Sequence, residues 1–126
     1  MPFLHIMGLE SGDSGRRQLA RRLTGVIVDS LAVDADSVTI YFAAHDRAHY
    51  AHGGEMSSPT RRRIFVNLHI LARDVGLRRA VAAGVCAAIA DVTGCEPRNI
   101  AVYFHERAPD EVAHAGILES ERKDTG

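Results

Sequence analysis

The 126-residue sequence contains no tryptophan, only two cysteines and a single lysine, and its net charge is −1. A nearly neutral chain creates no strong field for nucleic acids or membrane surfaces, so we expect neither as a partner. The two cysteines lack a Cys-x-x-Cys spacing and indicate reduced thiols rather than a disulfide framework. The longest apolar run, Ala80–Ala90, is too short to span a bilayer, and no apolar leader is evident. These absences predict a cytoplasmic protein.

The sequence does contain enough apolar material for one core. Hydrophobic residues make up 46% of the chain and aromatic residues 6%, which favours an aliphatic core in a single domain covering residues 1–126. All basic residues except Lys123 are arginines. Because the arginine side chain binds carboxylates and phosphates through a planar fork, this composition slightly favours an anionic ligand.

The two halves of the chain are similar to each other. Residues 2–56 align without a gap on residues 64–118, and the linker between them is 57–63. The most informative difference falls at the start of the halves, where Pro2 has Ile64 opposite it. Matching pairs include Phe3 and Phe65, Tyr41 and Tyr103, Ala51 and Ala113, and His52 and His114.

Each half has the pattern of a strand, a helix and a second strand. In the first half, strands are predicted at Phe3–Met7 and Val38–Ala43, and Ser11–Gly15 has the composition of a helix N-cap. In the second half, strands are predicted at Ile64–Ile70 and Ile100–Phe104. The helices are marked by apolar residues at helical spacing: Leu19, Leu23, Val26, Ile27 and Leu31, then Val81, Val85, Ala88, Ile89 and Val92, with Gly94 at the second helix end.

A strand–helix–strand unit of this length forms a right-handed crossover between parallel strands. Two units therefore predict an α/β (α+β) fold with a four-stranded sheet and both helices on one face. The other face keeps apolar residues, and we expect another subunit to cover it in a homo-oligomer, most simply a closed ring. The residues after Glu119 are expected to form a polar, frayed end.

The duplication, the proline after Met1 and the segment Tyr50–Glu55 resemble the tautomerase superfamily. The short pattern is similar to the 4-oxalocrotonate tautomerase group, and the fused length is similar to the cis-3-chloroacrylic acid dehalogenase branch. The resemblance implies a tautomerase/MIF-like fold and a homotrimer without a cofactor. It also implies that Met1 is removed and that the Pro2 amine acts as general base or acid on a small carboxylate-bearing keto or enol substrate.

The residues themselves are consistent with this chemistry. An α-amino group has an ordinary pKa of about 8, and both apolar burial and nearby arginines disfavour its protonated form. Arg73, placed just after the third strand, could hold a substrate carboxylate through two parallel hydrogen bonds. Other site candidates follow from the resemblance or from positions at strand ends. They are Tyr103 as a hydroxyl donor, Tyr50 as a pocket wall, and Glu106, Arg107 and His114 as substrate-binding residues.

The sequence also departs from the family pattern. Ser11-Gly12, Thr39 and Ala101 stand where arginines are expected, and Ile27 stands where the dehalogenase branch has a histidine. These departures argue against chloroacrylate dehalogenation. They leave open a tautomerase, a hydratase or decarboxylase, and a non-catalytic oligomeric binding protein. His45, His49 and His52 could resemble a metal cluster, but no convincing ligand set completes it, and no metal is predicted.

Overall fold

The structure is a computed structural model, and it describes residues 1–56 and 62–123. Most of the predicted linker 57–63, and with it Arg61, lies outside the described residues. The main elements of the first half are β1 (Phe3–Met7), α1 (Asp13–Leu31) and β2 (Thr39–Ala43). Those of the second half are β5 (Ile64–Leu71), α2 (Val75–Thr93) and β6 (Ile100–Arg107). Short elements connect or follow them: η1 (Ala35–Ser37), η2 (Arg47–His49), β3 (Ala51–His52), β4 (Glu55–Met56), η3 (Pro97–Asn99), η4 (Pro109–Glu111), β7 (Ala113–His114), β8 (Ile117–Leu118) and η5 (Glu119–Glu121).

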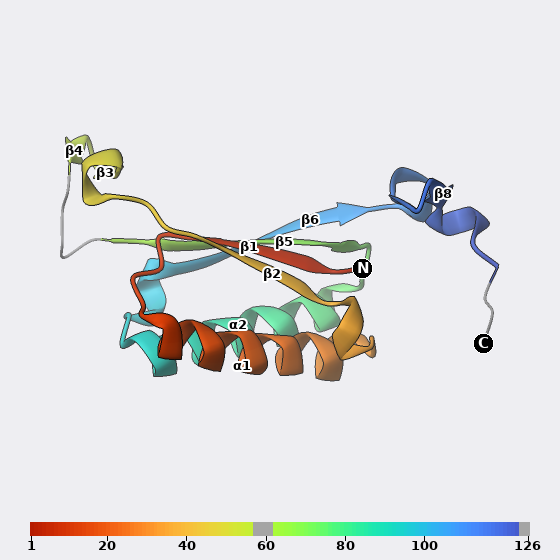
Figure 1. Cartoon of the computed structure of the whole chain (residues 1–126), viewed down its shortest axis with the longest axis horizontal. Helices are drawn as coiled ribbons and strands as arrows, with labels where there is room; N and C mark the ends of the chain where they lie inside the picture. The colour runs from red at the N-terminus through yellow and green to blue at the C-terminus, as the bar shows by residue number, and fades with distance from the viewer. Residues whose placement is uncertain (57–61, 124–126) are drawn as a thin grey trace.

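The four long strands form one sheet in the order β2-β1-β5-β6. Within each half the two strands are parallel, and β1 and β5 join the halves in an antiparallel pair. Both helices cover the same face of this sheet, and the small hairpins β3–β4 and β7–β8 project beyond its opposite ends (Figure 1). The predicted α+β fold and the duplicated strand–helix–strand plan are confirmed.

The core lies between the sheet and the helices. Alternate residues of β1 and β5 point into it, among them Leu4, Ile6, Val66 and Leu68, which are fully buried. Most of the helix residues that the spacing predicted are buried in this core: Leu19, Leu23, Ile27, Leu31, Val81, Val85, Ala88 and Ile89. Val26 and Val92, predicted with them, pack against the core and are only partly buried. The core is aliphatic, as the composition predicts. In the described part of the chain, neither helix is long and apolar enough to cross a bilayer.

The helix ends agree only in part with the sequence prediction. Gly94 ends α2 with a left-handed backbone (φ 74°), as expected for a C-cap glycine. At the start of α1, Gly12 is the N-cap residue, and no side chain caps this end. A side-chain cap exists instead in the second half, where the Asp74 carboxylate accepts a hydrogen bond from the Leu77 N–H at 2.9 Å. The N-cap predicted within 11–15 is thus confirmed in position, although no side chain there makes the capping hydrogen bond.

The sheet face opposite the helices is open in the single chain. It exposes aromatic residues, with Tyr41 63%, Tyr103 55% and Phe3 38% exposed. The two repeated tyrosines point away from the core because they alternate with the core-facing residues of their strands. On the same face the His69 ring stacks between the rings of Phe3 and His105, with centroid distances of 4.2 and 4.4 Å.

Candidate active site

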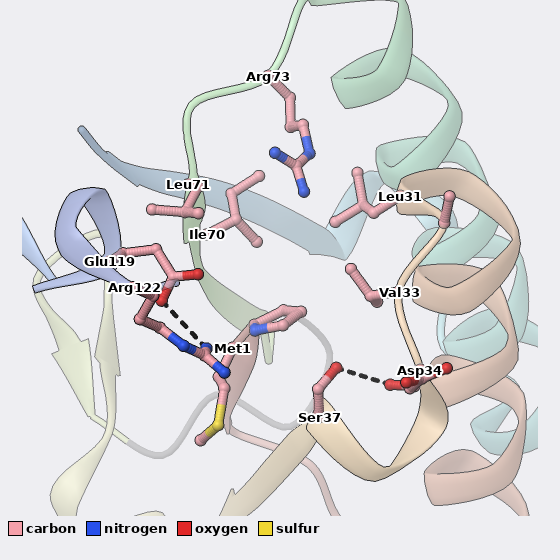
Figure 2. Close-up of a pocket in the computed structure, with 12 residues that line it drawn as sticks. Met1, Leu31, Val33, Asp34, Ser37, Ile70, Leu71, Arg73, Glu119 and Arg122 are labelled. Atoms are coloured by element: carbon pink, nitrogen blue, oxygen red, sulfur yellow. Dashed lines mark hydrogen bonds and ion pairs between the residues drawn. The ribbon is translucent and has the colours of Figure 1, made fainter. Parts of the chain in front are cut away.

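Pro2 lies at the edge of the sheet, immediately before β1. It is buried, and its carbonyl accepts a hydrogen bond from the Thr39 N–H at 3.1 Å, which fixes its position beside β2. A proline fits at a strand start because it has no N–H to donate. Pro2 lines a cavity of about 510 Å³, the size of a small-molecule site. The cavity is also lined by Met1, Leu31, Ala32, Val33, Asp34, Ser37, Ile70, Leu71, Arg73, Glu119 and Arg122 (Figure 2).

Arg73 lies in the turn between β5 and α2, and its side chain enters the same cavity (Figure 2). The Glu106 carboxylate on the neighbouring strand β6 accepts a hydrogen bond from the Arg73 backbone N–H at 3.1 Å. Among the described residues, no carboxylate pairs with the Arg73 guanidinium. The guanidinium therefore remains available for an anion in the cavity.

Glu106 stabilises this turn and does not line the cavity. Its carboxylate also pairs with the Arg78 guanidinium of α2 at 2.5 Å, and its side chain is only 18% exposed. The hydrogen bond from Arg78, together with that from the Arg73 N–H and the two positive charges, lowers the pKa of the Glu106 carboxyl, although burial opposes this. Glu106 thus ties β6, the Arg73 turn and the first residues of α2 together.

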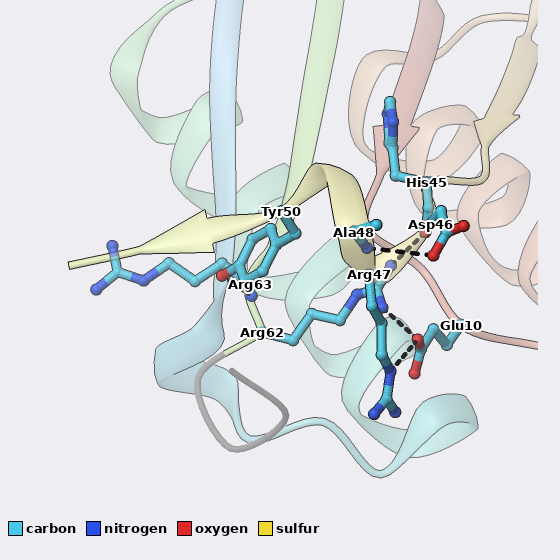
Figure 3. A network of polar contacts seen from close by, with 8 residues as sticks. All are labelled: Glu10, His45, Asp46, Arg47, Ala48, Tyr50, Arg62 and Arg63. Atoms are coloured by element: carbon cyan, nitrogen blue, oxygen red, sulfur yellow. Dashed lines mark hydrogen bonds and ion pairs between the residues drawn. The ribbon is translucent and has the colours of Figure 1, made fainter. Parts of the chain in front are cut away.

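The other predicted residues do not join Pro2 in its cavity. Tyr103 lies on the open sheet face, and His114 is exposed on β7. Arg107 lines a smaller neighbouring cavity of about 180 Å³ with Met1, and its guanidinium donates to the Glu106 carbonyl at 3.0 Å. Tyr50 lies at the other end of the sheet, where its hydroxyl accepts a hydrogen bond from the Arg63 N–H at 2.9 Å (Figure 3).

A second cavity, of about 320 Å³, occupies the equivalent place in the second half. Ile64 stands there where the first cavity has Pro2. The Arg62 guanidinium reaches into the polar network at this end, where it pairs with Glu10 and donates to the His45 carbonyl (Figure 3). Cys95 lines the same cavity, and burial, followed by the charges of Glu96 and Cys86, raises the pKa of its thiol. Without a chain-terminal amine and with its arginine already paired, this cavity lacks the chemistry of the first.

The C-terminal turn was missed as part of the site. The sequence predicted a frayed end after Glu119, yet Glu119 and Arg122 both line the Pro2 cavity. Their side chains form an ion pair at 3.3 Å. The spacing of an acidic and a basic residue three positions apart was the available signal, because such residues meet within one helical turn.

The described residues contain no group of three or more histidine, cysteine, aspartate or glutamate side chains placed to hold a metal ion. His45, His49 and His52, considered as a cluster, occupy the loop and hairpin after β2. The Tyr50 hydroxyl lies 3.5 Å from the His52 Nδ1, which makes this histidine part of the hairpin structure.

A family model described as "Tautomerase enzyme" matches residues 2–59, which is the first half of the duplication. No curated protein sequence matches the chain significantly. Among solved structures, Pt0534 inactivated by 2-oxo-3-pentynoate aligns with a TM-score of 0.84 at 18% identity, over 94% of this chain and 96% of that one. A fused 4-OT symmetric trimer aligns with a TM-score of 0.80 at 20% identity, over 96% and 98%.

A malonate semialdehyde decarboxylase, whose structure is discussed in terms of decarboxylase and hydratase activities, aligns with a TM-score of 0.70 at 14% identity, over 88% of each chain. At these identities the structural similarity establishes the fold, while the sequence match covers the half that begins with Pro2. The structural similarity and the sequence match are both consistent with the duplicated strand–helix–strand plan. Residues 2–59 of this chain match the tautomerase family, and the chain as a whole has the fold of the fused 4-OT structures.

Proposed function

We propose that this protein is a tautomerase (an isomerase) in which Pro2, after removal of Met1, transfers a proton on a small keto or enol substrate that carries a carboxylate. The observation that carries the proposal is the position of Pro2, buried in the wall of a cavity of about 510 Å³ that Arg73 also lines. While Met1 is attached, the nitrogen of Pro2 is an amide and cannot accept a proton. Removal of Met1 creates a secondary amine at the same position.

The reaction requires only this amine and a bound substrate. The neutral Pro2 nitrogen takes the proton from the enol hydroxyl, the electrons shift along the conjugated system, and a carbonyl forms. The protonated amine then returns the proton to a carbon atom, so that one O–H bond is lost and one C–H bond is gained. No group is consumed, and the amine ends as it began.

Arg73 has two roles in this proposal. Its guanidinium binds the substrate carboxylate through parallel hydrogen bonds and stabilises the negative charge that develops on the oxygen of the intermediate. Its positive charge also opposes protonation of the nearby amine, which keeps part of Pro2 in the basic form. The apolar side chains of Leu31, Val33 and Ile70 in the cavity wall strengthen both effects, because they lower the local polarity.

The proposal includes a homotrimer. The open sheet face carries the exposed aromatic side chains of Phe3, Tyr41 and Tyr103, and a second and third copy of the chain would cover them. The fused 4-OT neighbour forms a symmetric trimer, which supports this assembly. The proposal extends to a cytoplasmic location, since both cysteines are free thiols, which reducing compartments maintain.

A hydratase or decarboxylase is the second candidate. Asp34 lines the cavity near Pro2 and adds a carboxylate that could activate a water molecule. Substitution of Asp34 by asparagine separates the two candidates. A tautomerase keeps its keto–enol activity in this variant, whereas a hydratase loses the addition of water.

The first test is the mass of the purified chain and its activity on phenylenolpyruvate and 2-hydroxymuconate. We expect the mass to lack one methionine residue and Pro2→Ala to lower kcat/KM by about 100-fold or more. Incubation with 2-oxo-3-pentynoate should modify Pro2 in the mature chain.

A matched control carries one additional alanine before Pro2, which blocks the amine and leaves the rest of the cavity unchanged. Retained Met1, full activity of the blocked chain, or an unmodified Pro2 would each refute the mechanism and favour a non-catalytic binding protein.

A further inference from the structure

The open sheet face carries three histidines that the proposed reaction does not use. His5 lies on β1, His69 on β5 and His105 on β6, so three neighbouring strands contribute one each. The register places His69 between Phe3 and His105 in one row across the sheet, and His5 lies in the next row opposite Asn67. We infer that these histidines make association of the chain with further copies of itself sensitive to pH, because their protonation separates the copies. This inference rests on the homotrimer of the proposed function and specifies its regulation.

The contacts of His69 and His105 hold their rings face to face. The ring centroids lie 4.4 Å apart and the ring planes differ by 11°, and the Phe3 ring stacks on the other side of His69 at 4.2 Å. The Asn67 Oδ1 accepts a hydrogen bond from the His105 Nε2 at 3.0 Å, which fixes the orientation of that ring. A positive charge on either imidazole therefore lies directly against the other ring, and two charges there repel each other.

The four described strands of the sheet supply no acidic partner for these histidines. The charged groups that act on His69 are His105 and Arg107 on β6 and His5 on β1, and all of them are basic. Glu106 is the only acidic residue within β1, β2, β5 and β6, and its carboxylate is on the helix side of the sheet, where it pairs with an arginine of α2. Protonation therefore adds positive charge to a face on which the four strands place none of the opposite sign.

With neutral histidines the open sheet face is suited to self-association. It exposes the aromatic rings of Phe3, Tyr41 and Tyr103, and a tyrosine ordinarily carries no charge near pH 7. The C-terminal segment adds the apolar Val112 beside Phe3. Apart from Arg107, the four strands then place no charged side chain on this face, so a second copy covers it without burying many charges.

Covering the face with another copy makes protonation harder. In the single chain, burial lowers the pKa of the His69 ring, and the charges of His105, Arg107 and His5 lower it further. A covering copy removes more water from the rings, which disfavours their charged form. The separated chain therefore binds protons more readily than the assembled one. Association is favoured above the ordinary histidine pKa of about 6.5 and weakens as the pH falls below it.

The test measures the mass of the assembly rather than its activity. Sedimentation velocity of the mature full-length protein at constant ionic strength compares about pH 7.5 with about pH 5.5, a range that lies above the ordinary pKa values of carboxyl groups. We expect the trimer at the higher pH, and a concentration for half-dissociation that rises at least about tenfold at the lower pH. Circular dichroism at each pH should show an unchanged fold.

Matched variants assign the effect to the histidines. His69→Phe/His105→Gln keeps an aromatic ring in the stack and a donor for Asn67 but removes two titrating groups, so its half-dissociation concentration should change by about threefold or less between the two pH values. His69→Lys carries a charge at both pH values and should be dissociated already at about pH 7.5. His49→Gln, which removes an exposed histidine of η2, should behave as the wild type.

The outcomes separate this inference from the proposed function. An assembly with the same half-dissociation concentration at both pH values, or a double variant with the full pH response of the wild type, would overturn the inference and leave the trimer intact. A single chain at about pH 7.5 would overturn the trimer and the inference together. Loss of the circular dichroism signal on dissociation would assign the effect to unfolding and also overturn the inference. A trimer that dissociates at the lower pH but has no activity in any form would refute the proposed catalysis and support the inference.

Discussion

The Glu106 carboxylate on β6 accepts a hydrogen bond at 3.1 Å from the backbone N–H of Arg73, which lies in the turn that follows β5. The same carboxylate pairs with Arg78 at the start of α2. One acidic side chain thus holds the short segment between a strand and a helix from which Arg73 enters the cavity. The position of the arginine depends on a residue that does not line the cavity itself.

Apart from Pro2, Arg73 is expected to be the residue whose loss most affects the substrate. Arg73→Gln removes the fork that binds the carboxylate and should lower kcat/KM by about 100-fold, with little change in the free energy of unfolding. Steady-state kinetics on phenylenolpyruvate measures this effect. Arg79→Gln makes the same charge change on the exposed side of α2 and should retain activity. Equal losses in both variants would assign the effect to net charge rather than to the site.

Glu106→Gln is expected to affect both activity and acid stability. The glutamine can still accept from the Arg73 N–H but loses the ion pair with Arg78, so we expect a kcat/KM lower by about three- to tenfold. Because the folded state lowers the pKa of Glu106, this carboxylate stabilises the fold above its ordinary pKa, and the contribution disappears as the pH falls through the lower folded value.

Acid unfolding, followed by circular dichroism, tests the expected effect on acid stability. The wild type should lose stability more steeply than Glu106→Gln as the pH falls below about 4.5. Glu111→Gln is the control, since the Glu111 carboxylate accepts from the Ala108 N–H at 3.0 Å on the exposed turn η4. If Glu106→Gln and the wild type had parallel acid-unfolding curves, the proposed linkage would be absent.

His69 should make the stability of the protein sensitive to pH in the near-neutral range. Burial between Phe3 and His105 lowers the pKa of the His69 ring, and the charges of His105, Arg107 and His5 lower it further. The unfolded chain therefore binds the proton more readily than the folded one, and stability decreases as the pH falls below about 6.5. In His69→Phe, the melting temperature should fall less between about pH 7.5 and pH 5.

The control for His69 is His49→Gln, which removes an exposed histidine at the opposite end of the sheet. This variant should keep the pH dependence of the wild type. Thermal melts at several pH values compare the three proteins. A steeper dependence in His69→Phe than in the wild type would contradict the sign derived from the lowered pKa.

Gly84 is expected to be required for the close packing of the two helices. A Cβ at this position would lie 2.7 Å from Val26 Cγ1 of α1, too close for unshifted atoms. Gly84→Ala should therefore lower the free energy of unfolding by about 1–2 kcal/mol, although alanine is the better helix former. Gly25→Ala on α1, where a Cβ would meet no atom within 4 Å, should raise it by about 0.5–1 kcal/mol.

Denaturant unfolding of Gly84→Ala and Gly25→Ala tests this contrast. The double variant Val26→Ala/Gly84→Ala should recover part of the loss, because the shorter side chain makes room for the new Cβ. Stabilisation by Gly84→Ala would show that the helices can separate at no free-energy cost.

The fold could be predicted largely from local patterns. Alternating apolar residues define the core face of β1 and β5, and the helical spacing of Leu19, Leu23 and Ile27 defines the buried side of α1. These patterns are visible because burial acts on each residue within its own element. The duplication also predicted the plan of the second half and distinguished Pro2, the position at which the halves differ most tellingly.

The composition of the cavity depended on contacts between distant segments. Arg73 was predicted at a strand end, but its support by Glu106 comes from the pairing of β5 with β6. Within the single chain, the register puts Tyr103 on the open face and the η2–β3 hairpin puts Tyr50 at the end of the sheet opposite Pro2, so their roles as hydroxyl donor and pocket wall stay predictions. No local pattern encodes the distance between such elements.

The sequence alone determined the repeated strand–helix–strand units, the aliphatic core and the single proline at the head of the first unit, because these follow from residue type and spacing along the chain. Only the tertiary structure decided that Arg122, in a segment expected to fray, lies beside Pro2 and Arg73. The hairpin β7–β8 and its hydrogen bond from Glu119 to Val112 bring that segment back to the start of the chain. This return depends on backbone geometry summed over many residues, which short-range patterns do not contain.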